Sequence, residues 1–182
     1  MVIPSPEHVP GYIDALQRRW SPDTTRPAAA AEELQRIEAD PEHFLREMDD
    51  REARGSAITL VNGTTVPRLP GFRRWMWDGE FCGSIGLRWQ PGTTELPAHC
   101  LGHIGYTVVP WKRNRGHATD ALRQMLPLAR AEGLSSVDIV AEPDNLVSQR
   151  VIQTNGGMLV EEFTKTEANG GGTALLYRIR LS

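Results

Sequence analysis

The basic turn from Arg113 to Ala118 constrains the fold of this chain more than any other segment. It follows an apolar, strand-like stretch that ends at Val109-Pro110. It precedes a run in which apolar residues recur with the spacing of an amphipathic helix. Gly116 allows the backbone of the turn to approach a ligand closely. The segment therefore predicts a strand, a tight turn and a helix whose N-terminus is open to an anion.

The chemistry of this turn suits a pyrophosphate. The first turn of a helix carries N–H groups without intrahelical partners and a partial positive charge. Lys112, Arg113 and Arg115 add cationic charge around it. The phosphate-loop and dinucleotide motifs are excluded, because no Gly-Lys-Ser/Thr ending and no GxGxxG after a strand occurs. By itself the turn is a common pattern and identifies only an anion cradle.

The rest of the hydrophobic pattern predicts two helices, an antiparallel meander, a strand–helix–strand–helix segment and a final hairpin. Helices are expected over residues 5–20, 28–54 (with an interruption near residues 40–41), 116–132 and 145–154, and strands over 57–61, 72–77, 81–89, 100–109, 137–141, 158–166 and 173–181. Asp78-Gly79 marks a tight hairpin turn. We expect one α+β, or mixed α/β, domain over residues 1–182, with a helical part at 1–55 and a sheet core at 56–182.

Composition narrows the partners and the location. The net charge of −3 does not favour nucleic acid or an anionic membrane as partner. No apolar run approaches the roughly 20 residues that span a bilayer, and the N-terminus does not resemble a signal peptide. The two cysteines, Cys82 and Cys100, form no CxxC pair and no zinc-like spacing with histidine. We therefore expect no metal and a reducing, cytoplasmic setting.

Two motifs, in the order that the family has them, resemble the GNAT acetyltransferase superfamily. Arg113, Gly116 and Ala118 match its Q/R-x-x-G-x-G/A signature, and residues 103–110 resemble the strand before it, the family's fourth. Residues 145–157 resemble the N-x-x-A/S-x(7)-G segment that follows the family's fifth strand. The resemblance extends from about residue 72 to residue 163. It implies a central mixed, mostly antiparallel sheet, flanked by helices, with the fourth and fifth strands splayed apart.

The resemblance also implies a cofactor site and a reaction. Acetyl-coenzyme A, as co-substrate, would lie between the splayed strands, and its acetyl group would pass to a primary amine of a small molecule or peptide by direct attack. The residues that the resemblance assigns to the cofactor are Val108 and Val109 at the pantetheine arm, the amides of Asn114, Arg115, Gly116, His117 and Ala118 with Arg113 at the pyrophosphate, and Asn145 and Ser148. The side chain of His117 is expected to face solvent.

The acid–base groups are less clearly marked. An amine needs a base to lose its proton. In many family members a glutamate precedes the Gly-Tyr pair by two residues, and His103 stands there in this sequence. A histidine satisfied by hydrogen bonds inside the sheet is an equal alternative. Glu142 and Asp144 are further candidate bases, or groups that only bind a cationic substrate or cap the helix at Asn145. Ile152 replaces a tyrosine general acid of many relatives, so Tyr106, Tyr177 or solvent must protonate the thiolate.

A second interpretation of the whole chain stays open because Ile152 cannot donate a proton. The chain is then a GNAT-like module that binds or senses acyl-coenzyme A without catalysis. No motif specifies the acceptor amine, and a homodimer through exposed sheet edges is compatible with the sequence.

Overall fold

The structure is a computed structural model that describes residues 1–23, 26, 28–60 and 62–181. Its helical elements are η1 (Pro6–His8), α1 (Val9–Gln17), α2 (Ala29–Ala39), α3 (Pro41–Arg46), η2 (Pro110–Lys112), α4 (His117–Ala131), α5 (Leu146–Thr154) and η3 (Glu167–Asn169). Its strands are β1 (Asp49–Asp50), β2 (Ile58–Thr59), β3 (Thr65–Val66), β4 (Gly71–Trp77), β5 (Phe81–Arg88), β6 (Ile104–Val108), β7 (Ser136–Ala141), β8 (Met158–Thr164) and β9 (Thr173–Arg180).

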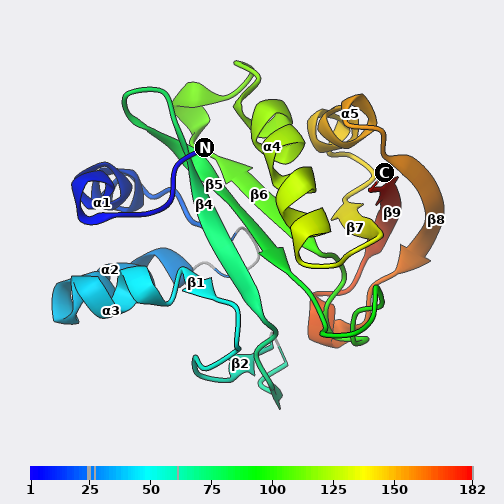
Figure 1. The fold of residues 1–182 in the computed structure, drawn as a ribbon, viewed down its shortest axis with the longest axis horizontal. Coiled ribbons are helices and arrows are strands. Elements are labelled where there is room, and N and C mark those ends of the chain that lie inside the picture. The colour runs from blue at the N-terminus through cyan, green and yellow to red at the C-terminus, as the bar shows by residue number, and fades with distance from the viewer. Residues whose placement is uncertain (24–25, 27, 61, 182) are drawn as a thin grey trace.

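The described strands form two sheets and a separate ribbon. One sheet has the order β1-β4-β5-β6, the other the order β7-β9-β8, and β2 pairs only with β3. Figure 1 shows α1, α2 and α3 on one side of the four-stranded sheet and α4 on the other. The expected fold class, a mixed α/β arrangement with mostly antiparallel strands and flanking helices, is confirmed.

The N-terminal helices are fixed to β4 by a buried aromatic cluster and one buried carboxylate. Tyr12 of α1 is fully buried and stacks on Trp75 of β4, with ring centroids 4.5 Å apart. Glu33 of α2, 7% exposed, accepts hydrogen bonds from the Tyr12 hydroxyl and from Arg73 of β4. Burial in the first place, together with the Glu33 charge, raises the pKa of Tyr12 well above its usual value. The helices therefore belong to the same packed body as the sheet.

The expected long helix over residues 28–54 is wrong in its last third. Helix α3 ends at Arg46, and Asp49 and Asp50 form β1 beside β4. The Asp50 carboxylate accepts the N–H groups of Arg54 and Gly55, which closes a turn where the charge pattern had suggested a helix. A side chain that bonds nearby backbone groups in this way competes with helix formation.

The meander and the crossover helix follow the sequence prediction closely. Strands β4 and β5 pair antiparallel around the turn at Asp78-Gly79. Gly116, with φ of +83°, caps α4, and Pro127 lies inside this helix, which continues to Ala131. Two strand expectations need correction. Residues 100–103 are not part of β6, and β3 was not predicted; Val61, the expected end of the first strand, lies outside the described residues.

The two sheets meet at one point and diverge from there. The His103 N–H donates to the Asp138 carbonyl at 2.7 Å, and the Asp138 N–H donates to His103 Nδ1 at 2.9 Å. Gly102 permits this approach, because a Cβ there would lie 3.1 Å from the Asp138 oxygen. Beyond this junction β6 and β7 share no ladder among the described strands. The splay that the resemblance implied between these two strands is therefore present.

Candidate active site

The turn before α4 has the backbone geometry that the predicted anion cradle requires. Asn114 and Gly116 have φ of +59° and +83°. The Asp120 N–H donates to the Gly116 carbonyl and is the first backbone N–H after the turn with an acceptor among the described residues. Within the described part of the chain, the N–H groups of residues 114–119 have no acceptor. A Cβ added at Gly116 would meet no atom within 4 Å, so the space in front of the turn is open. Unpaired amides at a helix N-terminus suit a phosphate group.

The cradle is attached to the β4–β5 hairpin by charged contacts that the sequence did not reveal. Lys112 Nζ lies 3.0 Å from Asp78 Oδ1 and 2.8 Å from Glu80 Oε2. The hydrogen bond from Lys112 is the main cause that lowers the pKa of Asp78. His117 also turns toward the hairpin, with Nε2 3.5 Å from Asp78 Oδ2. The expected solvent-facing orientation of His117 is therefore wrong, because its ring is four-fifths buried against the hairpin.

The backbone of β6 offers hydrogen-bonding groups to the opening between the sheets. In the antiparallel ladder with β5, Val109 N–H donates to Cys82 and Arg88 N–H donates to His103. Because such pairs alternate along a ladder, the backbone groups of Ile104, Tyr106 and Val108 point away from β5. The Val108 carbonyl accepts a bond from Arg113 Nε at 3.3 Å, which ties the cradle to the strand.

Val109 is a correction within the expected cofactor set. Its N–H donates to Cys82 O at 2.9 Å, and its carbonyl accepts the Lys112 N–H at 3.0 Å. Its side chain is fully buried with the N-terminal aromatic cluster. Both backbone groups are engaged, so Val109 is not available to pair with a pantetheine arm, whereas the free N–H of Val108 stays compatible with that role.

Tyr106 and Ser148 meet across the opening, although they were predicted for different roles. The Tyr106 hydroxyl lies 2.8 Å from Ser148 Oγ and 3.3 Å from the Ser148 carbonyl oxygen. Burial raises the pKa of Tyr106 to about 12, so the phenol stays protonated at neutral pH. The pair joins β6 to the first turn of α5, where Asn145 accepts the Ser148 N–H at 3.1 Å as the helix cap. The pair therefore places two hydroxyl groups between β6 and α5.

His103 lies at the junction of the two sheets. It is 1% exposed, and Nδ1 accepts the Asp138 N–H, which leaves the proton of the neutral ring on Nε2. Within the described residues, Nε2 has no hydrogen-bond partner. Burial is the main cause that lowers the pKa of His103, so the ring is neutral at physiological pH. A neutral imidazole has the right charge for a base, but its accepting nitrogen is already engaged.

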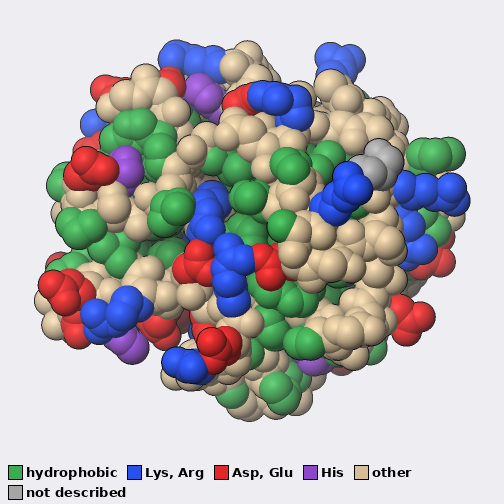
Figure 2. All heavy atoms as spheres, viewed as in Figure 1, with side chains coloured by type: hydrophobic (Ala, Val, Ile, Leu, Met, Phe, Trp, Pro, Cys, Tyr) green, Lys and Arg blue, Asp and Glu red, His purple; other side chains and the backbone are tan. Residues whose placement is uncertain are grey.

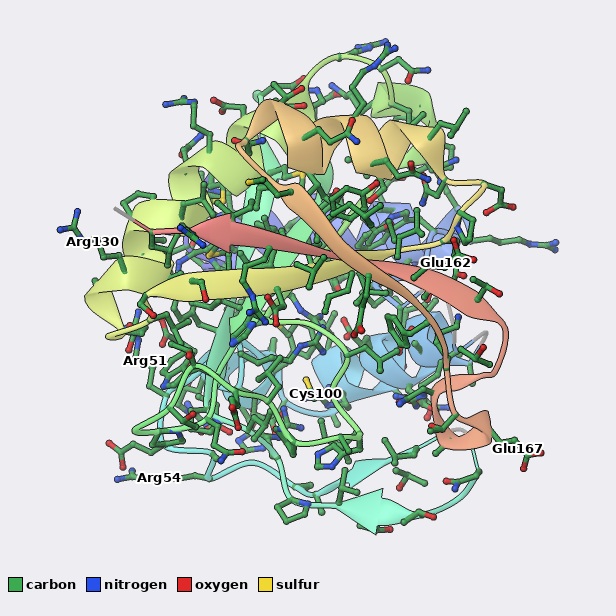
Figure 3. The ribbon with its side chains drawn as sticks, turned by 90° about the vertical axis from the view of Figure 1, so that its right-hand side faces the viewer. Arg51, Arg54, Cys100, Arg130, Glu162 and Glu167 are labelled. Carbon is green, nitrogen blue, oxygen red and sulfur yellow. The ribbon has the colours of Figure 1, made fainter. Side chains whose placement is uncertain are left out.

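Glu142 is less suited to proton abstraction than the sequence suggested. Its carboxylate accepts a bond from Lys165 Nζ at 2.6 Å, and its side chain is about half exposed. One of its oxygens is therefore already engaged by an ammonium group. Figure 3 views the molecule from the side of β8 and β9, with Glu162 on β8, Glu167 between β8 and β9, and Cys100 in the loop that leads to β6.

Ile152 is a core residue. It is fully buried, and Gly157 packs so closely on it that a Cβ at 157 would lie 2.3 Å from Ile152 Cγ2. No polar group stands at this position, so proton donation must come from elsewhere, as expected. Tyr177 is buried and donates to Gln149 Oε1 at 3.3 Å, which leaves Tyr106 as the tyrosine hydroxyl beside Ser148.

Two diverging sheets, a crossover helix and an anion cradle at its N-terminus define an acetyltransferase-type fold. Residues 4–158 match the family model described as "Acetyltransferase (GNAT) domain". The chain therefore belongs to the GNAT acetyltransferase family. A search of curated proteins gave no match.

Solved acetyltransferases share this fold over nearly the whole chain. The Microcin C7 self-immunity acetyltransferase MccE, solved with acetyl-CoA and AMP, is 13% identical with a TM-score of 0.60, covering 98% of this chain and 89% of that chain. RimL, the ribosomal L7/L12 α-N-protein acetyltransferase solved with coenzyme A, is 13% identical with a TM-score of 0.60, covering 99% and 92%. A ribosomal-protein-serine acetyltransferase structure from Vibrio cholerae is 12% identical with a TM-score of 0.57, covering 98% and 91%.

Two surface findings complete the description. Across the described residues, no helix combines the length and the apolar character that a bilayer span requires. On the face shown in Figure 2, basic and acidic side chains are interspersed rather than separated into areas of one sign.

Proposed function

We propose that this chain is an N-acetyltransferase that transfers the acetyl group of acetyl-CoA to a primary amine of a small molecule or peptide. The observation that carries the proposal is the row of partnerless N–H groups at residues 114–119, placed beside the opening between β6 and β7. Oriented amides bind a pyrophosphate without any rearrangement. The backbone groups of Val108 and Tyr106 that face the opening are placed to bind the pantetheine arm.

The proposed chemistry is direct attack of the amine nitrogen on the acetyl carbonyl carbon. Backbone N–H groups of β6 that face the opening are placed to stabilise the oxyanion. Breaking of the carbon–sulfur bond releases a thiolate, and the Tyr106–Ser148 hydroxyl pair is placed to return a proton to it. The amine loses its proton to His103 or to Glu142, directly or through water. Both are candidate bases, although His103 Nδ1 already accepts the Asp138 N–H and the Glu142 carboxylate already accepts a bond from Lys165.

The test of the cradle is a pair of aspartate substitutions at glycines with the same backbone. Gly116→Asp and Gly133→Asp both place a side chain on a residue with φ above +80° and with open space in front of it. Gly116 caps the N-terminus of α4, whereas Gly133 follows its C-terminus. The strain is therefore matched, and only Gly116→Asp brings negative charge to the cradle.

We expect calorimetry to show loss of acetyl-CoA binding in Gly116→Asp and wild-type binding in Gly133→Asp, with similar melting temperatures for the two variants. Binding that survives in Gly116→Asp would show that the cofactor does not use this turn. The same loss in both variants would assign the effect to strain in the helix rather than to the cradle.

The alternative function is a non-catalytic acyl-CoA-binding or sensing module. It is favoured by the contacts of the two candidate bases, because the His103 acceptor nitrogen is bonded to Asp138 and Glu142 is paired with Lys165. The two functions differ in one measurement. Coenzyme A release with any member of a panel of polyamines, amino acids and peptides supports the enzyme, and tight binding without release across the panel supports the module.

A further inference from the structure

Three potential metal ligands of different chemistry converge where the β4–β5 hairpin meets the start of α4. They are the carboxylate of Asp78, the thiol of Cys82 and the imidazole of His117, and their ligand atoms all lie within 4.8 Å of one another. We propose that these three residues bind a divalent cation of the zinc class. The site lies behind the anion cradle and is independent of the function proposed above.

The spacing fits a tetrahedral ion after small adjustments. Zinc bonds of about 2.0–2.3 Å in tetrahedral geometry require ligand atoms about 3.4–3.8 Å apart. His117 Nε2 and Asp78 Oδ2 are already 3.5 Å apart. The other pairs, at no more than 4.8 Å, need to close by at most about 1.4 Å, through rotation of the Asp78 side chain for its pair with Cys82 and of the His117 ring for the pair of His117 with Cys82. Cys82 is fixed on β5 and fully buried, so the carboxylate and the imidazole are the ligands that adjust.

The His117 ring is oriented as a ligand whose partner is missing. Nε2 is buried and, within the described residues, makes no hydrogen bond. A buried polar atom of this kind requires a partner, because its desolvation is otherwise uncompensated. The ring points into the cluster rather than to solvent. Because His117 is the first residue of α4, the helix holds its backbone in place. A metal ion would satisfy this nitrogen directly.

The local charges balance when a divalent ion binds. Binding breaks the S–H bond of Cys82 and releases its proton to solvent, so a thiolate and the Asp78 carboxylate together neutralise the two charges of the ion. Lys112, which now lies 3.0 Å from Asp78 Oδ1, retains its partner Glu80 at 2.8 Å. The ammonium group therefore does not have to leave the region. Three protein ligands leave the fourth position of a tetrahedral ion for a water molecule.

The sequence alone did not suggest this site, because its ligands are far apart in the chain. Asp78 and Cys82 are four residues apart on a hairpin, and His117 follows 35 residues later on a helix. The spacing therefore matches no zinc motif. The fold brings the three together because Val109, at the end of β6, pairs with Cys82 just before the chain turns into α4.

The test is titration of the tag-free, full-length protein with Co²⁺, followed by competition with Zn²⁺. We expect one equivalent of Co²⁺ to produce a near-ultraviolet cysteinate-to-cobalt band together with the strong visible bands of four-coordinate cobalt, and Zn²⁺ to abolish both. Cys82→Ser is expected to remove the near-ultraviolet band. His117→Ala is expected to weaken binding by more than the roughly 10–100-fold that loss of an outer-shell partner costs.

Cys100→Ser is the matched control, because it removes the other thiol of the chain. Cys100 lies beyond the opposite end of β5 from Cys82, in the loop that leads to β6 (Figure 3). This variant should retain the full spectrum. Absence of the thiolate band in the wild-type protein, or its loss in Cys100→Ser with retention in Cys82→Ser, overturns the proposal. If Cys82→Ser fails to fold, the same cobalt titration of His117→Ala and Asp78→Asn, at partly exposed positions, tests the proposal instead. Loss of either ligand should weaken cobalt binding.

Discussion

Replacing Tyr106 by phenylalanine should change the free energy of unfolding in a direction that depends on pH. The phenol hydroxyl bonds Ser148 Oγ at 2.8 Å, and both groups lie at the opening between the sheets. Loss of this hydrogen bond at pH 8 should lower the free energy of unfolding by about 1 kcal/mol, because Ser148 can still bond to water. At this pH the phenol is protonated in both the folded and the unfolded chain, so its titration adds nothing.

At pH 11 the titration of Tyr106 reverses the order of stability of the wild type and Tyr106→Phe. The pKa of the phenol is about 12 in the folded protein and about 10 in an unfolded chain. A raised pKa means that stability is complete below pH 10 and is lost as the pH rises toward 12. Linkage at pH 11 gives a loss of about 1.4 kcal/mol from this group in the wild type and none in Tyr106→Phe. The variant should therefore match or slightly exceed the wild type in stability.

Urea denaturation at pH 8 and pH 11 measures both quantities. Ser148→Ala is the matched control, because it removes the same hydrogen bond and keeps the phenol, so its stability should stay below that of the wild type at both pH values. The same difference between wild type and Tyr106→Phe at pH 8 and pH 11 would refute the argument. Under the proposed function, Tyr106→Phe should also lower kcat while acetyl-CoA binding is unchanged, since the pair acts after the cofactor is bound.

Three further predictions, two of them with a control variant, test other parts of the structure. Glu33→Ala should lower the free energy of unfolding by about 3 kcal/mol, because it leaves buried partners without their shared carboxylate. Glu32→Ala, at an exposed ion pair, should cost less than about 1 kcal/mol in the same denaturation assay, and equal losses would contradict the burial argument. If His103 is the base, His103→Ala should remove the acidic limb of the pH–rate profile, whereas an unchanged limb leaves the ring a structural role only. Gly157→Ala should cost at least about 2 kcal/mol, because its methyl carbon would lie 2.3 Å from a neighbouring side chain. Gly86→Ala, whose nearest atom is at 3.6 Å, should melt close to the wild type, and equal melting temperatures of the two glycine variants would show that the close contact relaxes freely.

The elements that the sequence predicted well are those with a strong local signal. The Asp78-Gly79 turn, the glycine at 116 and the helical spacing after it depend on neighbouring residues only. The turn and the start of α4 were therefore predicted correctly, and the cradle itself stays a prediction. Strand β1 was missed because Asp49 and Asp50 are poor strand formers, and it is their pairing with β4 that makes them a strand.

The parts of the site that were not predictable depend on tertiary contacts. The burial of His117 against the hairpin follows from the packing of α4, which no local pattern encodes. The engagement of both Val109 backbone groups follows from its ladder partner and from the turn after β6. The contact between Tyr106 and Ser148 joins residues 42 positions apart. The sequence predicted the strand, turn and helix of the candidate site, whereas the orientation of its side chains required the fold.

The single junction between β6 and β7 has a consequence for how the molecule meets other chains. Two strands that diverge inside a protein present unpaired edges to each other, and exposed edges are where foreign strands add and aggregation begins. Here both edges line an internal opening, beside a junction at which Gly102 brings the backbones into contact. An extended ligand that pairs with β6 would protect its outward N–H groups from exchange with solvent water. Hydrogen-exchange protection at Tyr106 and Val108 is therefore a direct readout of what occupies the opening.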